Sequence, residues 1–333
     1  MNFKKFLLFF YLFLFFVSEA YATQIEKIAV FPFENFTEDK NAESVIMPVL
    51  KQKLKDKGYE ILDDNVLNKF FLKERIRTTG YISKDIAKKI KEEFNVDAIL
   101  LGSINSFSKN NLQVGISAYF VNPSDSTIIW ADHASASAED FVKILGLGKI
   151  ETIQELTSKV LDRLIKSFDK VPAFKEKELT YKIAVMPFKN KSKIKKAGQI
   201  VTYMFIEELF KNKNFEPVNY GEIKKAIIDL RIRKKEQLDF KTIKSISDYL
   251  GVDGIIIGTV ESYNEQEGNF PPQVTITARL IDVRRNRILW CDSYQYKGDD
   301  GIFIFDWGKI TTAENVGYKV VSKLLNKMSK IEW

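Results

Sequence analysis

The stretch Ile28-Ala29-Val30-Phe31-Pro32-Phe33 decides the fold, because the chain contains it twice. It returns as Ile183-Ala184-Val185-Met186-Pro187-Phe188, 155 positions later. Two further blocks repeat in the same order, Val96–Ser103 as Val252–Thr259 and Ile128–Asp132 as Ile288–Asp292, at offsets of 156 and 160. This period is far longer than that of a solenoid repeat, so the pattern predicts a duplicated domain.

The repeats place one domain at residues 23–168 and a second at 181–333. Each is long enough to bury a hydrophobic core of its own. Residues 169–180 form a polar, charged linker with one proline, Pro172. A linker this short predicts that the two domains lie side by side.

Residues 1–22 have the pattern of a secretory signal peptide. Lys4 and Lys5 precede an apolar run, Phe6–Val17, and Ala20-Tyr21-Ala22 fits the small-residue rule for cleavage after Ala22. The apolar run is shorter than the roughly 20 residues that a membrane-spanning helix needs. We therefore expect export and cleavage, with an uncleaved N-terminal anchor as the alternative.

Cysteine usage bears on where the exported chain resides. Cys291 is the only cysteine, so no disulfide within the chain is possible. The signal does not end in a cysteine that could carry a lipid, so the chain is not predicted to be a lipoprotein. We expect a periplasmic protein, with peripheral association with the outer membrane left open.

Within each copy, short apolar strands and amphipathic helices alternate before an antiparallel meander. This order predicts an α/β fold, with two tandem copies of a mixed-sheet sandwich. In the first copy the expected strands are Ile28–Phe33, Tyr59–Leu62, Asp97–Phe107, Gln113–Val121 and Thr127–Ala134, and the expected helices are Ala42–Leu54, Val66–Leu72, Lys84–Phe94 and Ile150–Phe168.

Three motifs resemble a group of bacterial envelope proteins. They are the opening I-A-V-x-P-F, the block V-D-x-I-I-x-G-x-V at Val252–Val260, and R-L-I-D-V-x-x-x-x-I-L-W-x-D-S from Arg279 to Ser293. The group contains the curli secretion protein CsgG, the polysaccharide-export lipoprotein PelC, the penicillin-binding-protein activator LpoB and the N-terminal domain of TolB. The resemblance covers residues 25–330 as two copies.

This resemblance implies a non-catalytic periplasmic binding or assembly module that recruits or regulates secretion, polysaccharide or peptidoglycan machinery. The chain departs from the named members in lacking the lipid-bearing cysteine and in being a tandem. The alternative is a ring-forming subunit of a CsgG-like outer-membrane secretion channel. Only Gln113–Val121 and Gln273–Ile281 approach the alternation that such a channel requires.

An enzyme is poorly supported by the residues. His133 is the only histidine and aligns with Ser293, while Cys291 aligns with Ala131 in the other copy. No histidine-based metal cluster or catalytic triad can be assembled from them, and we expect no metal and no cofactor. Gly146–Lys149 lacks the spacing of a phosphate-binding loop, and Asp299-Asp300 lacks further cation ligands.

Charge gives the strongest functional signal. Residues 23–168 carry a net charge of −1 and residues 169–333 a net charge of +7. After the first strand, Glu34–Asn41 has a net charge of −2, whereas the matching loop carries Lys189, Lys191, Lys193, Lys195 and Lys196. Strand carboxyl ends are frequent binding sites in α/β sheets. We expect these lysines to bind an anionic polymer, an envelope protein or the acidic loop of a neighbouring subunit. The alternative is a solvated loop.

Nucleic acid is not an expected partner of an exported chain, whereas a homo-oligomer is possible. Residues that recur at matched positions are expected to have structural roles, because packing is retained between duplicated domains. These residues are Trp130 and Trp290, Pro32 and Pro187, and Gly102 and Gly258. Asp132 and Asp292 follow the tryptophans and are expected to be exposed.

Overall fold

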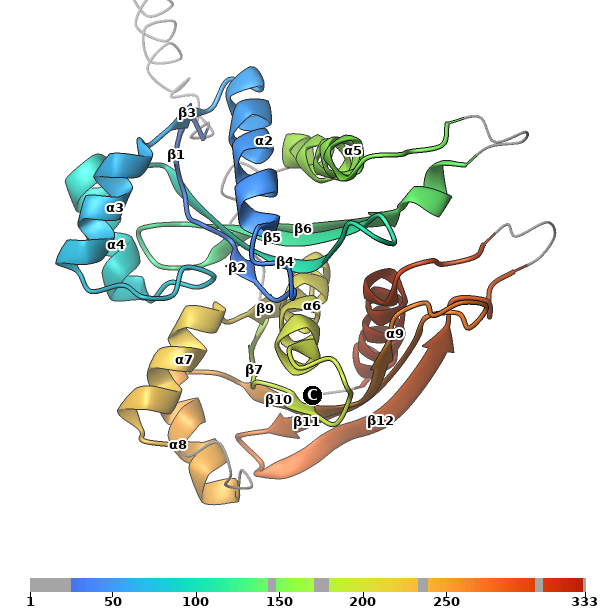
Figure 1. The fold of residues 1–333 in the computed structure, drawn as a ribbon. Helices are drawn as coiled ribbons and strands as arrows, with labels where there is room; N and C mark the ends of the chain where they lie inside the picture. The colour runs from blue at the N-terminus through green and yellow to red at the C-terminus, as the bar shows by residue number, and fades with distance from the viewer. Residues whose placement is uncertain (1–24, 143–147, 171–179, 233–238, 303–307, 332–333) are drawn as a thin grey trace, which may run out of the picture.

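The computed structural model describes residues 25–142, 148–170, 180–232, 239–302 and 308–331. They form two mixed parallel and antiparallel sheets with helices, in two halves of similar architecture (Figure 1). This confirms the predicted α/β fold class. We call residues 25–170 the first half and residues 180–331 the second half.

The described elements of the first half follow the order expected from the sequence. They are β1 (Lys27–Val30), β2 (Glu34–Asn35), α2 (Ala42–Asp56), β3 (Glu60–Ile61), α3 (Asp64–Lys73), α4 (Lys84–Phe94), β4 (Ala98–Ser108), β5 (Gln113–Val121), β6 (Ile128–Ser137), the short η1 (Ala138–Phe141), α5 (Ile153–Lys166) and η3 (Ser167–Lys170).

The second half follows the same path. Its described elements are β7 (Tyr181–Val185), β8 (Lys189–Asn190), α6 (Ala197–Lys211), β9 (Phe215–Pro217), α7 (Tyr220–Asp229), α8 (Phe240–Leu250), β10 (Gly254–Asn264), β11 (Gln273–Asp282), β12 (Arg287–Lys297) and α9 (Ala313–Met328).

The two sheets have matching topology. The strand order is β3-β1-β4-β5-β6 in the first and β9-β7-β10-β11-β12 in the second. The opening strand of each half pairs in parallel with its neighbours, whereas the last three strands form antiparallel pairs. The antiparallel part is the meander that the turn pattern predicts.

The halves stack in layers (Figure 1). α2 and α5 cover one face of the first sheet, while α6 and α9 lie between the two sheets. The helices of the second half therefore contact both sheets. We call the face of the first sheet toward α6 and α9 the covered face. On the other face of the second sheet, α7 and α8 pack over β7 and β10. The rest of that face, formed by β11, β12 and the end of β10 beside β8, carries no helix among the described residues, and we call this part the open face.

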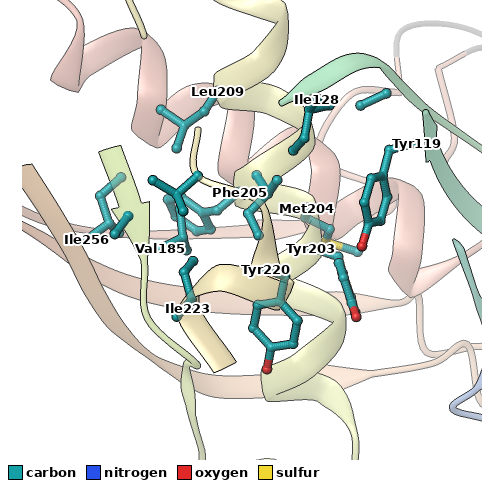
Figure 2. Packing of buried hydrophobic residues seen from close by; sticks show 14 of the residues in the cluster. Tyr119, Ile128, Val185, Tyr203, Met204, Phe205, Leu209, Tyr220, Ile223 and Ile256 are labelled. Carbon is teal, nitrogen blue, oxygen red and sulfur yellow. The ribbon is translucent and has the colours of Figure 1, made fainter. Parts of the chain in front are cut away.

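Helix α6 has the composition that this middle position requires. Its buried residues lie on all sides, including Ile200, Tyr203, Met204 and Phe205. A helix that is apolar all round is a buried helix. Figure 2 shows Phe205 toward the second sheet and Tyr203 toward Tyr119 of the first. One apolar cluster therefore contains residues from both halves.

Local signals explain most element boundaries. Asp63 caps α3 by accepting hydrogen bonds from the backbone N–H groups of Asn65 and Val66. Gly58, with a φ of +94°, follows α2 in the left-handed region that favours glycine. At α4, Ser83 makes no side-chain cap. Instead Glu222 of the second half accepts from the N–H of Lys84, 2.5 Å away.

Three expectations require correction. The predicted strand Ile28–Phe33 ends at Val30, because Pro32 lacks an N–H and interrupts pairing before β2. The predicted helix Ile150–Phe168 begins at Ile153, where Thr152 caps it. Asp132 and Asp292 are only partly exposed, because each forms an ion pair with a helix lysine, Lys211 and Lys327 respectively.

The matched residues with expected structural roles lie as follows. Trp130 is buried with its ring 4.3 Å from that of Phe168, whereas Trp290 is half-buried. A Cβ at Gly102 would lie 2.6 Å from the Phe33 ring, and one at Gly258 would lie 2.1 Å from the Phe188 ring. Each glycine thus lets a phenylalanine cross its strand. Pro32 and Pro187 follow the buried ends of the opening strands and are half-buried.

Several expectations fall outside the described residues. They concern the signal peptide at 1–22, nearly all of the linker at 169–180, and residues 146 and 147 of the glycine-rich stretch. Among the described residues, no helix combines the length and the apolar character that crossing a bilayer requires.

Candidate functional site

A groove of about 410 Å³ lies on the open face, and we call it the basic groove. It forms where β7 ends and β8 begins, beside the centres of β10 and β11. The residues that matter for its chemistry are Pro187, Lys189, Lys191, Thr259, Glu261, Thr277 and Arg279. The groove therefore brings three cations and one carboxylate together on an exposed sheet surface.

The five lysines of the predicted binding loop do not act as one group. Lys189 and Lys191 line the basic groove, and Lys191 Nζ lies 2.8 Å from Glu261 Oε2. Lys196 points elsewhere, with its Nζ 5.9 Å from the centre of the Phe36 ring of the first half. Lys193 and Lys195 are exposed. The structure thus separates the loop into a groove side and a side toward the first half.

The acidic and basic loops contrasted in the sequence meet through Lys196. Burial raises the pKa of Glu34, and the charges of Lys196 and Lys224 act against that rise. An interaction that the sequence allowed between neighbouring subunits therefore occurs within one chain. Lys196 belongs to the contact between the halves.

The two sheet faces differ sharply in exposure. All nine residues of β5 are buried, because the first sheet is covered on both sides. Along β11 every second residue from Gln273 to Arg279 is partly or fully exposed. Arg279 in β11 occupies the position of Tyr119 in β5, and Thr277 that of Ser117. The groove is therefore the second-half counterpart of a surface that the first half buries.

The covered face binds the second half through a polar cluster around Glu314. Its carboxylate accepts a hydrogen bond of 2.8 Å from Asn105 Nδ2 and a longer one of 3.5 Å from Ser106 Oγ. A Cβ at Gly115 would lie 1.6 Å from Glu314 Oε2, so only glycine leaves room for this carboxyl. Burial raises the pKa of Glu314 to about 8, against the effect of the Asn105 hydrogen bond.

A second buried group surrounds Tyr318. Its hydroxyl donates to Glu207 Oε2 and lies 2.8 Å from Ser117 Oγ. The His133 ring stacks on the Tyr318 ring with their centres 3.2 Å apart. Burial raises the pKa of Glu207 well above its usual range and lowers that of His133 to about 3. The His133 ring is therefore uncharged near neutral pH.

We call Asn105, Ser117, His133, Glu207, Glu314 and Tyr318 the interface cluster. It fixes the halves to each other, and its two carboxyls are fully buried. His133 lies in this cluster, whereas Cys291 is exposed on β12 beside Arg279. In the described ranges, no three histidine, cysteine or carboxylate side chains are placed to hold a metal ion.

Sequence reasoning found Lys189 and Lys191 but missed Arg279 and Glu261. The usable signal was the alternation in Gln273–Asp282, where polar residues occupy every second position up to Arg279. It also missed Glu314, whose signal is a carboxylate within the otherwise apolar stripe of α9. In both cases the sequence shows an unusual residue, but the residues that it contacts belong to an element far away in the chain.

No protein-family model matches this chain, and no curated protein matches it. Among solved structures, it is similar to the PelC dodecamer from Paraburkholderia phytofirmans, with 15% identity over 45% of this chain and 92% of that one, and a TM-score of 0.31. It is similar to lipoprotein GNA1162 from Neisseria meningitidis, with 22% identity over 42% of this chain and 97% of that one, and a TM-score of 0.31. It is similar to the LpoB C-terminal domain from Escherichia coli, with 14% identity over 39% of this chain and 93% of that one, and a TM-score of 0.26. TM-scores of this size do not establish a shared fold, so the fold assignment rests on the sheet topology.

Proposed function

We propose that this protein is a non-catalytic binding and assembly module of the bacterial cell envelope, exported to the periplasm. The observation that carries the proposal is the contrast between the covered face and the open face. The same sheet surface is used for packing in the first half and is left available in the second. A surface with three cations on it is suited to recognising an anionic partner.

The fixed arrangement of the halves supports a scaffold. Helix α6 packs on both sheets, and hydrogen bonds from Asn105 and Ser117 reach α9 at 2.8 Å each. Hydrogen bonds between buried polar groups favour one arrangement of the elements that they join. The basic groove is therefore held at a fixed position relative to the first half.

A binding role fits the groove better than catalysis. Its charged groups are lysines, one arginine and a glutamate that already pairs with Lys191. Catalysis by a nucleophile needs a base within hydrogen-bonding distance of that nucleophile. In the described groove the hydroxyls of Thr259 and Thr277 lie beside cations, which can hold an anion but cannot accept a proton from a hydroxyl.

The cellular assignment is supported by the signal-peptide pattern at residues 1–22 and by the envelope-protein resemblance of the strand motifs. We expect the mature chain to begin at Thr23 and to recruit or regulate secretion, polysaccharide or peptidoglycan machinery.

The mass of purified residues 23–333 in solution tests this proposal. We would measure it by light scattering after gel filtration, with and without a mild detergent. A monomer or dimer whose mass is independent of detergent supports the adaptor. A large ring that stays dispersed only in detergent contradicts it and supports a CsgG-like secretion-channel subunit instead.

A further inference from the structure

The covered face shows how this type of sheet surface binds a partner. It receives α9, whose Tyr318 hydroxyl lies 2.8 Å from Ser117, and the N-cap residue Thr312, which accepts from Ser135 at 3.1 Å. The carboxylate of Glu314 reaches Asn105 in the same layer. On the covered face, a row of small polar side chains therefore forms hydrogen bonds with a helix that carries a buried carboxylate.

The open face repeats this polar row. Thr277 donates to Ser293 at 3.0 Å, and Ser262 donates to Thr275 at 2.8 Å. The strand registers place Thr277 where the covered face has Ser117. The two faces therefore share their row of hydroxyls, although only one of them is covered by helices.

Cations replace aromatic rings at the edges of this row. Lys191 follows the short strand β8 as Phe36 follows β2, and Arg279 stands where the covered face has Tyr119. On the covered face, the rings of Phe36 and Tyr119 pack against Tyr203 of α6. The open face is therefore matched to a partner that presents negative charge at positions where α6 presents an aromatic ring.

The charges on the open face are not balanced within the chain. Glu261 is neutralised by Lys191, 2.8 Å away. Among the described residues, no carboxylate forms an ion pair with Lys189 or Arg279. Opposite charge on a partner would therefore gain two new ion pairs without breaking an existing one.

The partner segment must satisfy its own backbone. The N–H and C=O groups of β10 and β11, the central strands of this face, are already paired within the sheet, and only the outer edge of β12 is open to pairing. An extended peptide lying flat on this face would bury unpaired backbone groups, which is costly. A helix meets the requirement, because its hydrogen bonds are internal.

A second copy of this chain is a poor occupant. The helices that match α6 and α9 are α2 and α5, and together they carry a net charge of +2. Their charged residues are Lys51, Lys53, Lys55, Lys159, Arg163 and Lys166 against Glu43, Asp56, Glu155 and Asp162. Like charges facing the basic groove would repel it.

Resting on the proposed function, we propose that the open face is the docking surface for an acidic helix of a partner protein. Carboxylates of that helix lie between Lys189 and Arg279, and its polar side chains lie over the hydroxyls of Thr277 and Ser293. The helix occupies on the second sheet the place that α9 and α6 occupy on the first.

Cys291 provides a native reporter for this docking. It is exposed, it is the only cysteine, and it pairs with Arg279 across β11 and β12. Side chains directly opposite each other on neighbouring strands share a face. A helix bound on the open face would therefore slow alkylation of Cys291 by a maleimide.

The experiment titrates residues 23–333 with a synthetic stapled helix bearing glutamates at every fourth position. Its controls are the same composition broken by prolines, and polyphosphate of equal charge. We expect saturable binding of the stapled helix with matching protection of Cys291. Binding to the Lys189→Glu/Arg279→Glu variant should weaken by at least about tenfold, the size expected for losing two charge pairs and gaining two repulsions.

The matched control is Lys193→Glu/Lys195→Glu, which changes the net charge equally on the same loop but outside the groove. We expect this variant to bind within about twofold of the unmodified protein. Equal weakening by both variants would overturn the proposal, because binding would then follow net charge alone. Equal or tighter binding of the proline-broken peptide or of polyphosphate would also overturn it, in favour of an anionic polymer.

Failure of this docking proposal can be distinguished from failure of the proposed function. A detergent-dependent ring would defeat the adaptor whatever the helix does. A monodisperse monomer or dimer whose Cys291 remains unprotected at saturating stapled helix would refute the docking surface alone.

Discussion

The raised pKa of Glu314 predicts that this protein loses stability as the pH rises above neutrality. Burial raises the pKa of this carboxyl from 4.5 to about 8 in the folded chain. Between these values the folded chain holds one proton more than the unfolded chain, so raising the pH favours unfolding. The contribution of Glu314 to the free energy of unfolding is fully present below pH 4.5 and is lost as the pH rises through 8.

The size of this loss of stability follows from the shift in the pKa of Glu314. Each pH unit between the two pKa values costs about 1.4 kcal/mol, so the step from pH 6.5 to 8 costs about 2 kcal/mol. The raised pKa values of Glu207 and Glu265 act in the same direction. His133, with its pKa lowered to about 3, acts oppositely but only below its ordinary value of 6.5. The steepest loss therefore falls above pH 6.5.

The assay is urea unfolding of residues 23–333 at several values between pH 6.5 and 8. Glu314→Gln keeps the size of the side chain and still accepts from Asn105, but it cannot titrate. We expect its free energy of unfolding to fall less steeply than that of the unmodified protein, by about 1.4 kcal/mol per pH unit. The control is Glu155→Gln on the exposed side of α5. An unchanged slope for Glu314→Gln would refute the reasoning.

Three further outcomes are expected. Gly115→Ala should destabilise the protein by about 1–3 kcal/mol or more in urea unfolding, because the new Cβ meets the buried carboxyl of α9; Thr275→Ala, at the matched exposed position, should change it by less than about 0.5 kcal/mol. Trp130→Ala should cost about 3–5 kcal/mol, and clearly more than the same change at the half-buried Trp290; equal losses in urea would contradict the difference in burial. Intact-mass measurement of the periplasmic product should show a chain that begins directly after Ala22, and an uncleaved mass would contradict the export prediction.

Local physics explains why much of the fold could be predicted. The run Ile28–Val30 is too short and too uniformly apolar for an amphipathic helix, and the spacing of apolar residues in Lys84–Phe94 suits only a helix. Caps such as Asp63 and the left-handed Gly58 mark ends within a few residues of their helices. These signals depend on neighbours in the chain, so a single sequence contains them.

Only part of the candidate site could be predicted, because the rest depends on contacts between residues far apart in the chain. Lys189 and Lys191 stand out because five lysines crowd one loop. Nothing in that loop separates them from Lys196, which lies over the Phe36 ring of the other half. The direction of each lysine depends on where the first half packs, and that contact joins residues far apart in the chain.

By itself the sequence determined the two sheet-and-helix halves, the order of their elements and the basic character of the second half. The tertiary structure decided which sheet face is covered and which is open. It did so through contacts such as Asn105 with Glu314, separated by 209 positions. Periodicity reports that a strand has two faces, but burial of a face depends on which distant element packs on it. The same hydroxyl row is therefore an internal interface on the first sheet and an available surface on the second.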